Sequence, residues 1–203
     1  MEKNDSFLMK TAYVLGLYFI STVYGFIYET LFYYLNDGMW LRRGTCFGPF
    51  IQIYGFGGLL IYFVCRHFKK HPAAVLLLSG GMCGIMEYAA GWFIYTTMDG
   101  FRPWDYNTEI WNWGNINGFV CFRSLAVFAL SGIVLIYAVV PLLKLLRSRV
   151  GDKAFFWIMM IPGAVCALDT FYNDGLCKIF PLENAMTFWD KHGWSNVNPN
   201  KIY

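Results

Sequence analysis

Five apolar stretches alternate with short polar segments along the chain. At ~1.5 Å per residue in a helix, each stretch is long enough to cross the ~30 Å hydrocarbon core of a bilayer. The pattern therefore predicts an all-α fold, a polytopic transmembrane helical bundle with about five membrane-spanning helices. The predicted spans cover residues 11–35, 48–66, 72–98, 119–143 and 154–172.

Composition supports this prediction. Of the 203 residues, 57% are hydrophobic and only 14% are charged, whereas about 25% are charged in an ordinary soluble domain. We find no linker or repeat, so we expect a single membrane domain over residues 1–203, with a polar C-terminal tail at 173–203. The basic residues are spread among loops, which argues against nucleic acid as a partner.

Lys and Arg residues in the short loops indicate the orientation, because cytoplasmic loops carry an excess of them. Nine lie on the side that holds the N-terminus and six on the other side. We therefore predict a multi-pass protein of the cell membrane, with the N-terminus cytoplasmic and the C-terminus outside. The inner set is Lys3, Lys10, Arg66, Lys69, Lys70, Lys144, Arg147, Arg149 and Lys153, and the outer set is Arg42, Arg43, Arg102, Lys178, Lys191 and Lys201.

The six cysteines are scattered and show neither a CxxC pair nor a zinc-binding spacing. We interpret them as small buried residues. A disulfide bridge among Cys46, Cys121 and Cys177 remains an alternative if that face meets an oxidising compartment.

Ionisable residues inside the spans are costly, so they indicate either function or mutual pairing. Counting ~1.5 Å per residue from the helix ends places all of them in the outer third of the bilayer. We therefore predict a polar chamber open to the outer surface, in which Arg123 pairs with Glu87, Glu29 or both. A structural ion pair and a ligand site are both compatible with this pattern. The residues are Glu29, Glu87, Arg123 and Asp169.

Small residues share a helical face with the acids. Gly84 and Gly91 lie on the stripe of Glu87, and Gly80 with Gly84 forms a GxxxG pair. Small residues allow close helix packing in lipid. The acids are therefore expected to face the protein interior.

Two loops have an unusual composition. The first places Arg42 and Arg43 before Gly44 and the Gly48-Pro49 pair, which suits either an anion site or arginines that reach lipid phosphates. The second covers residues 99–118 and is rich in aromatic and carboxamide side chains. A loop of this length is uncommon without a function, and we expect it to form a lid over the chamber.

Several of these residues form an ordered set of motifs: Arg43-Gly44, Gly48-Pro49, Ile53-Tyr54-Gly55, Gly57, Glu87-Tyr88, Trp104-Asp105-Tyr106 and Asn117-Gly118. In them the chain resembles the ABC-transporter type IV family, the CmpB-like group of bacterial multi-pass membrane proteins. The resemblance runs from about Tyr13 to Leu143. It implies a membrane protein that acts as a transporter permease. The chain departs from the family pattern at Gln52, where Pro is usual, and at Phe119, where Arg is usual.

The motifs and the intramembrane charges together give the candidate ligand-binding residues. They are Glu29, Arg43, Gln52, Tyr54, Glu87, Trp104, Asp105, Tyr106, Asn117, Arg123 and Asp169.

We expect a transport component that binds a small solute from outside, for which an anion is one candidate. The sequence lacks the GxxxxGK[ST] pattern of ATP-hydrolysing proteins, so a separate ATPase subunit would have to supply the energy. The alternative is a membrane-embedded enzyme that acts on a lipid or lipid-linked headgroup, because acids and arginines suit acid–base work on phosphates. A sensor or partner subunit would have the same sequence features. No catalytic triad, metal site or cofactor is predicted.

Overall fold

The computed structural model describes residues 5–195, and in this range the protein is helical, with a single isolated β-bridge between Ile116 and Val120. The prediction of an all-α fold is confirmed. By contacts between Cα atoms the chain separates into two compact units. Unit 1 combines the chain up to Phe56 with the chain from Arg147 onward, and unit 2 is Gly57–Leu146. The single membrane domain stays a prediction.

Unit 1 pairs the N-terminal helix with helices from the C-terminal part of the chain. The long α1 begins after Ser6, whose hydroxyl accepts from the Met9 amide at 3.2 Å, and ends at Gly38, which has a φ of 70°. Such a left-handed residue is a common helix stop. The helices are α1 (Phe7–Asp37), the later part of α5 (Val140–Thr170), the π-helical η3 (Phe171–Leu176), α6 (Cys177–Ile179) and α7 (Ala185–Lys191).

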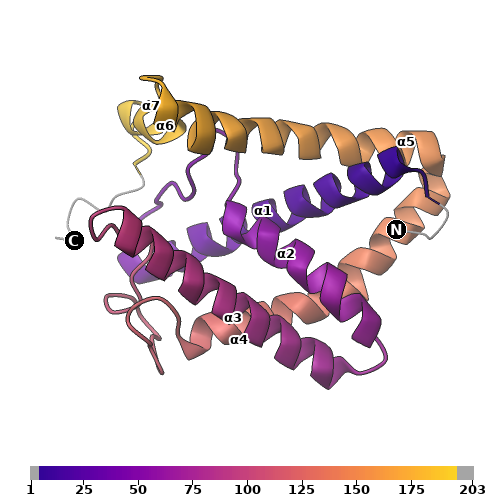
Figure 1. The fold of residues 1–203 in the computed structure, drawn as a ribbon, viewed down its shortest axis with the longest axis horizontal. Coiled ribbons are helices and arrows are strands. Elements are labelled where there is room, and N and C mark those ends of the chain that lie inside the picture. Colours follow the sequence, from indigo (N-terminus) through magenta and orange to yellow (C-terminus); the bar gives the residue numbers. More distant parts are fainter. Residues whose placement is uncertain (1–4, 196–203) are drawn as a thin grey trace. The chain divides into compact units, whose positions relative to one another are not determined.

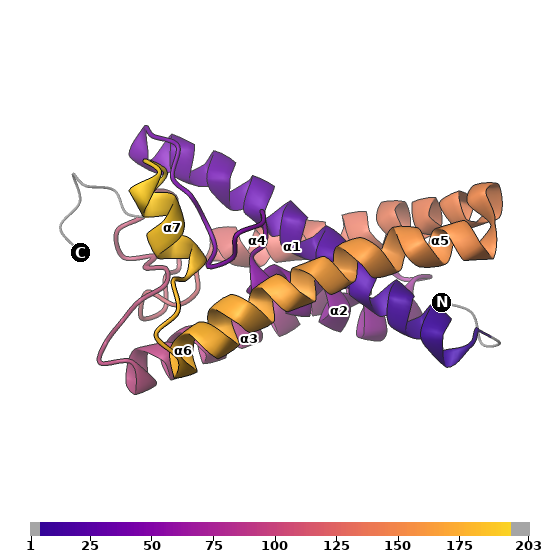
Figure 2. The ribbon, with the colours of Figure 1, turned by 90° about the horizontal axis from the view of Figure 1, so that it is seen from above.

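Glycines allow α1 and α5 to lie side by side (Figures 1 and 2). A Cβ atom on Gly163 would come within 2.6 Å of the Leu15 backbone, and one on Gly16 would collide with Met159. The two helices therefore approach each other more closely than larger residues would permit.

Unit 2 is built around α3 and α4, which lie against each other (Figure 1). Small residues stand where the two helices meet. Gly80 lies against Leu125 and Ala129, and Gly132 lies against Ser79. The predicted role of the Gly80–Gly84 pair in close helix packing is confirmed. The helices are α2 (Gln52–Cys65, from Gly57 on), η1 (Arg66–Phe68), α3 (Pro72–Thr97), α4 (Phe122–Val134) and the π-helical η2 (Leu135–Val139).

Three helical ranges in the described part of the chain are long and apolar enough to cross a membrane: Phe7–Asp37, Pro72–Thr97 and Phe122–Ile179. The third has 58 residues, about 87 Å at ~1.5 Å per residue, which is far longer than one crossing. It is broken at Gly151, where φ is 78° and ψ is 166°. The fourth and fifth predicted spans lie on either side of this break.

The second predicted span, residues 48–66, corresponds to a shorter helix. α2 has 14 residues, about 21 Å at ~1.5 Å per residue, which is less than the hydrocarbon core. It begins only at Gln52, and the Gly48 carbonyl, which would accept from the Gln52 amide in a longer helix, accepts instead from Arg42 and from the Phe50 amide. That this segment crosses the membrane stays a prediction.

The contact between Gly132 and Ser79 can be tested by adding one methyl group. We expect Gly132→Ala to destabilise the protein by about 1–3 kcal/mol, because the new Cβ would overlap the buried Ser79 side chain. The measurement is the thermal unfolding midpoint in detergent. Gly81→Ala is the matched control, since a Cβ there has nothing within 4 Å, and it should be neutral or stabilising by up to about 1 kcal/mol. Equal midpoints for the two variants would contradict this packing.

Candidate functional site

The predicted site residues fall into two groups, one in each unit. Unit 1 holds Glu29, Arg43, Gln52, Tyr54 and Asp169, and unit 2 holds Glu87, Trp104, Asp105, Tyr106, Asn117 and Arg123. Within each unit most of these side chains form specific polar contacts, and Tyr54 packs against α1. That both groups share one chamber stays a prediction.

In unit 1, the loop between α1 and α2 is organised by Arg42. Its guanidinium is buried and donates to the carbonyl oxygens of Cys46 at 2.7 Å, Phe47 at 3.0 Å and Gly48 at 2.6 Å. It also lies over aromatic rings, at 5.6 Å from that of Trp189 and 5.3 Å from that of Trp194. The side chain of Arg42 thus joins the loop to the C-terminal segment.

Asp169 of α5 binds the same peptide groups from the opposite side. Its carboxylate accepts from the amide of Phe47 at 3.0 Å and from the amide of Gly48 at 2.7 Å. Two consecutive peptide groups, Cys46–Phe47 and Phe47–Gly48, therefore each donate to Asp169 and accept from Arg42. We call this arrangement the Arg42–Asp169 relay, because the peptide dipoles connect the two opposite charges.

Arg43, the neighbouring arginine, pairs with α1 instead. Its Nε lies 3.1 Å from the Glu29 carboxylate, and its guanidinium lies 3.8 Å from the centre of the Tyr33 ring. The consecutive arginines therefore have different tasks, one binding carbonyl groups and the other an acid. Glu29 was predicted as a partner of Arg123, and its ion pair in unit 1 is with Arg43.

Gln52 and Tyr54 complete the group in unit 1. The Gln52 amide donates to Asp174 at 2.8 Å and to the Thr45 hydroxyl at 2.9 Å. The Tyr54 ring lies where a Cβ on Gly25 would be. The motif residue Tyr54 is therefore a packing contact of α1, and Gln52 ties the start of α2 to η3.

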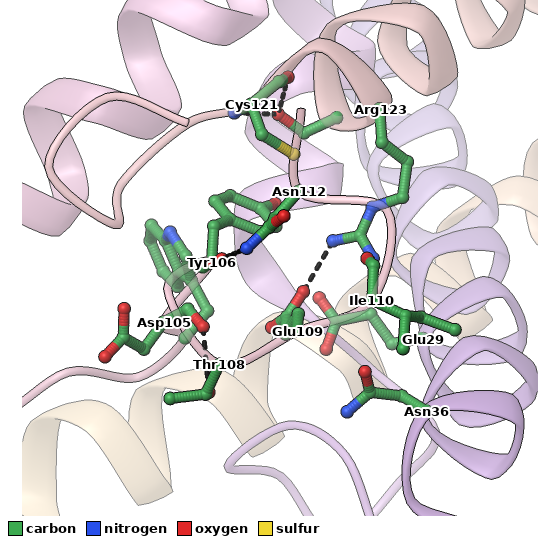
Figure 3. A network of polar contacts seen from close by, with 12 residues as sticks. Glu29, Asn36, Asp105, Tyr106, Thr108, Glu109, Ile110, Asn112, Cys121 and Arg123 are labelled. Carbon is green, nitrogen blue, oxygen red and sulfur yellow. Dashed lines mark hydrogen bonds and ion pairs between the residues drawn. The ribbon is translucent and has the colours of Figure 1, made fainter. Parts of the chain in front are cut away.

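In unit 2, four side chains form what we call the Glu87 cluster: Glu87, Tyr106, Glu109 and Arg123. The Tyr106 hydroxyl donates to Glu87 at 2.6 Å, and Arg123 forms an ion pair with Glu109 at 2.5 Å. The Arg123 guanidinium also lies 5.0 Å from the centre of the Tyr106 ring. Figure 3 shows Arg123 reaching from α4 toward Glu109 of the loop, with Tyr106 alongside.

The cluster is buried. Glu87 is 6% exposed, Tyr106 7% and Glu109 7%. Burial raises the pKa of Tyr106 well above its ordinary value of 10.0, and the charges of Glu87 and Glu109 act in the same direction. Tyr106 therefore keeps its proton at neutral pH and remains a hydrogen-bond donor to Glu87.

The loop that carries Tyr106 is folded back on itself. The Tyr106 amide donates to the Gly118 carbonyl at 3.0 Å, and the Trp104 indole donates to the Phe119 carbonyl at 3.0 Å. Gly118 has a φ of 78°, and a Cβ there would collide with Asp105. The distant motifs Trp104-Asp105-Tyr106 and Asn117-Gly118 are thus neighbours.

The same loop is fixed to α3 at a second point. Asn117 donates to the Tyr88 hydroxyl at 2.9 Å. Asn117 and the bulky Trp111 both have positive φ values, of 55° and 53°, which L-residues rarely adopt. Strained positions of this kind are found most often at functional sites.

The list of candidate ligand-binding residues omitted three residues that organise these sites: Glu109, Asp174 and Arg42, the last of which was considered only with Arg43 as part of an anion or lipid-phosphate site. Glu109 lies in an irregular loop, where no periodicity reveals which way a side chain points. Arg42 differs from Arg43 by one position, and only the loop conformation assigns their separate partners. Asp174 follows the predicted spans and lies in the π-helical η3, where helical spacing misplaces side chains.

A family model with the description Putative ABC-transporter type IV matches residues 16–173. The chain belongs to this family. The match includes both groups of site residues and confirms the resemblance found in the motifs. Comparison with curated proteins and with solved structures gives no match. The family and the apolar helices together make the chain a transporter-like membrane protein.

All six cysteines are free thiols, and all but Cys177 are buried. The structure therefore agrees with the interpretation as small buried residues and contains no disulfide among Cys46, Cys121 and Cys177.

The Arg42–Asp169 relay predicts where the backbone is protected from solvent. We expect Asp169→Asn to increase hydrogen exchange at the Phe47 and Gly48 amides by about tenfold or more, because one carboxylate oxygen is replaced by a donor and a hydrogen bond to a charged group contributes about 1.5–3 kcal/mol. Exchange is measured by mass spectrometry on peptides that cover residues 44–50. Asp190→Asn, at an exposed position in α7, is the control and should leave these peptides unchanged. Unchanged exchange in both variants would contradict the relay.

Cysteine labelling tests the environment of the same loop. Burial raises the pKa of the Cys46 thiol from 9.0 to about 12, so only about 1 in 10,000 molecules carries the reactive thiolate at pH 8. We expect N-ethylmaleimide to modify Cys177 first and to leave Cys46 unmodified until the protein is unfolded. Labelled positions are read from peptide masses. Early modification of Cys46, or a Cys177 that reacts only after a reducing agent is added, would contradict the structure.

Proposed function

We propose that this chain is the membrane-embedded permease subunit of an ABC-type transporter and that it binds a small polar solute at the Glu87 cluster. The observation that carries the proposal is the 2.6 Å hydrogen bond from Tyr106 to Glu87. This bond joins two of the motifs, Glu87-Tyr88 in the candidate membrane-spanning helix α3 and Trp104-Asp105-Tyr106 in the loop. The group at which they meet, the Glu87 carboxylate, is buried and ionisable.

The energetic cost of this cluster supports a functional role. Ionisable groups inside a membrane are expensive and mostly mark pathways for ions or solutes. A buried ion pair such as Arg123–Glu109 contributes little to stability compared with apolar residues of similar size. A fold that needed only packing at this point would be served better by the apolar residues that dominate α3 and α4.

The available groups define the kind of solute. Carboxylates accept hydrogen bonds, and a guanidinium and a phenol donate them. Such a set suits a small molecule that carries both donors and acceptors. The loop of residues 99–118, which covers Glu87 through Tyr106, would then act as the predicted lid.

The remaining parts of the proposal concern energy and orientation. The sequence contains no GxxxxGK[ST] pattern, so a separate ATPase subunit would hydrolyse ATP. With the N-terminus cytoplasmic and the C-terminus outside, a multi-pass arrangement would open the Glu87 cluster toward the outer surface.

The test is to identify small molecules that stay bound to the purified full chain, by native mass spectrometry from detergent micelles. We expect the wild-type protein to retain a small polar molecule and both Glu87→Gln and Arg123→Ala to retain at least about tenfold less. That ratio corresponds to the loss of one charged hydrogen bond worth roughly 1.5–3 kcal/mol. Glu183→Gln and Arg149→Ala are the charge-matched controls, because both residues are exposed, and they should behave as wild type.

A charge swap separates the two interpretations of the ion pair. If Glu109 and Arg123 serve only the fold, the double variant Glu109→Arg/Arg123→Glu should restore both the thermal midpoint and the bound molecule. We expect it to restore the midpoint and not the molecule. Full restoration of both, or a wild-type protein that carries no small molecule under any condition tested, would refute the solute site.

A further inference from the structure

Charges are segregated along unit 2. All of its acidic residues lie between positions 87 and 109, in the second half of α3 and the loop that follows. The residues from Gly57 to Met86 and from Phe122 to Leu146 contain no Asp or Glu. The acidic residues of the unit therefore gather at one end, whereas the charged residues at the other end are all basic.

The arginines at the acidic end have carboxylate partners. Arg123 pairs with Glu109, and Arg102 lies 3.8 Å from Asp105. At the other end, a basic loop at residues 66–71 reads Arg-His-Phe-Lys-Lys-His. Among the described residues, no carboxylate forms an ion pair with Lys69 or Lys70.

The basic loop has a fixed shape. The His71 amide donates to the Phe68 carbonyl at 2.8 Å, and the Tyr137 hydroxyl donates to the Lys69 carbonyl at 2.8 Å. These contacts hold the backbone, while the side chains of Lys69, Lys70 and His71 are exposed. The exposed charges of Lys69 and Lys70 therefore lie on a turn whose backbone is held by hydrogen bonds.

The loop directly precedes α3, which is long and apolar enough to cross a membrane. A membrane-spanning α3 would bring the side chains of the loop to the depth of lipid headgroups. Exposed aromatic rings accompany the charges: Phe68 is 41% exposed and Phe63 38%. The Arg66 guanidinium lies 5.3 Å from the centre of the Tyr62 ring and 5.4 Å from that of Phe63, which directs its charge along this apolar surface.

We propose that the basic loop, through Arg66, Lys69 and Lys70, binds the phosphate groups of anionic phospholipids. The chemistry matches, because an uncompensated group of cations at headgroup depth attracts anionic lipid. Aromatic rings beside the charges suit the boundary between headgroups and acyl chains. The inference is independent of the solute site, since it uses the opposite end of unit 2.

The experiment measures lipid selectivity of the full chain. Purified protein in detergent is mixed with equal amounts of phosphatidylglycerol and phosphatidylcholine of the same acyl chains, and native mass spectrometry counts the lipids retained. We expect a clear preference for phosphatidylglycerol. Each lysine near the surface accounts for about fivefold in binding, so Lys69→Gln/Lys70→Gln should reduce the preference by at least about tenfold.

Two controls make the result specific. Lys178→Gln/Lys191→Gln removes the same charge elsewhere and should retain the wild-type preference. The thermal midpoint of each variant in phosphatidylcholine alone should equal that of the wild type, which shows that the exposed substitutions leave the fold intact. Raising the salt from about 0.1 M to 0.5 M should weaken the preference, because salt screens exposed charges.

Three outcomes would overturn the proposal. One is equal retention of the two lipids by the wild type. Another is a preference that survives Lys69→Gln/Lys70→Gln. The third is loss of the bound lipid on adding millimolar inorganic phosphate, which would assign the loop to free phosphate instead of a lipid headgroup.

Discussion

The Arg42–Asp169 relay is the interaction on which the structure of unit 1 depends. A buried guanidinium and a carboxylate bind the two faces of the same pair of peptide groups. A buried polar backbone without partners is costly, and in this loop the two side chains supply partners that a helix or sheet would otherwise provide. The loop can therefore have an irregular shape and still remain close to apolar helices. Its shape in turn directs Arg43 toward Glu29.

Unit 2 uses a different solution to the same problem. Its long loop forms several backbone hydrogen bonds within itself, such as the one from the Tyr106 amide to the Gly118 carbonyl. It is then attached to α3 by two side-chain hydrogen bonds, to Glu87 and to Tyr88. In each unit an acidic residue of a long helix binds an irregular loop. Asp169 of α5 holds the loop between α1 and α2, and Glu87 of α3 holds the loop that follows α3.

The fold was more accessible from the sequence than the site. Apolar stretches and glycine spacing sufficed to locate the helices, because burial in lipid or protein imposes one simple rule on every turn of a helix. The predicted helix ends were less accurate. The second helix begins at Gln52 and not at Gly48, whose backbone is bound by the side chains of Arg42 and Asp169. The site depended on irregular loops. Helical spacing could identify Glu87 and Arg123, but the partners Tyr106 and Glu109 are set by turns at Trp111 and Gly118 that no periodic pattern reveals.

The discontinuous composition of unit 1 has a consequence for how the protein is made. The Phe47 amide and the Asp169 carboxylate are 122 residues apart in the chain, whereas unit 2 is one uninterrupted stretch between them. At about 5–20 residues per second, a ribosome needs roughly 6–24 s to add Asp169 after Phe47. During that interval α1 and its loop remain without Asp169, while the whole of unit 2, Gly57–Leu146, is synthesised. The order of synthesis therefore favours folding of unit 2 first, and the two parts of unit 1 pack together last.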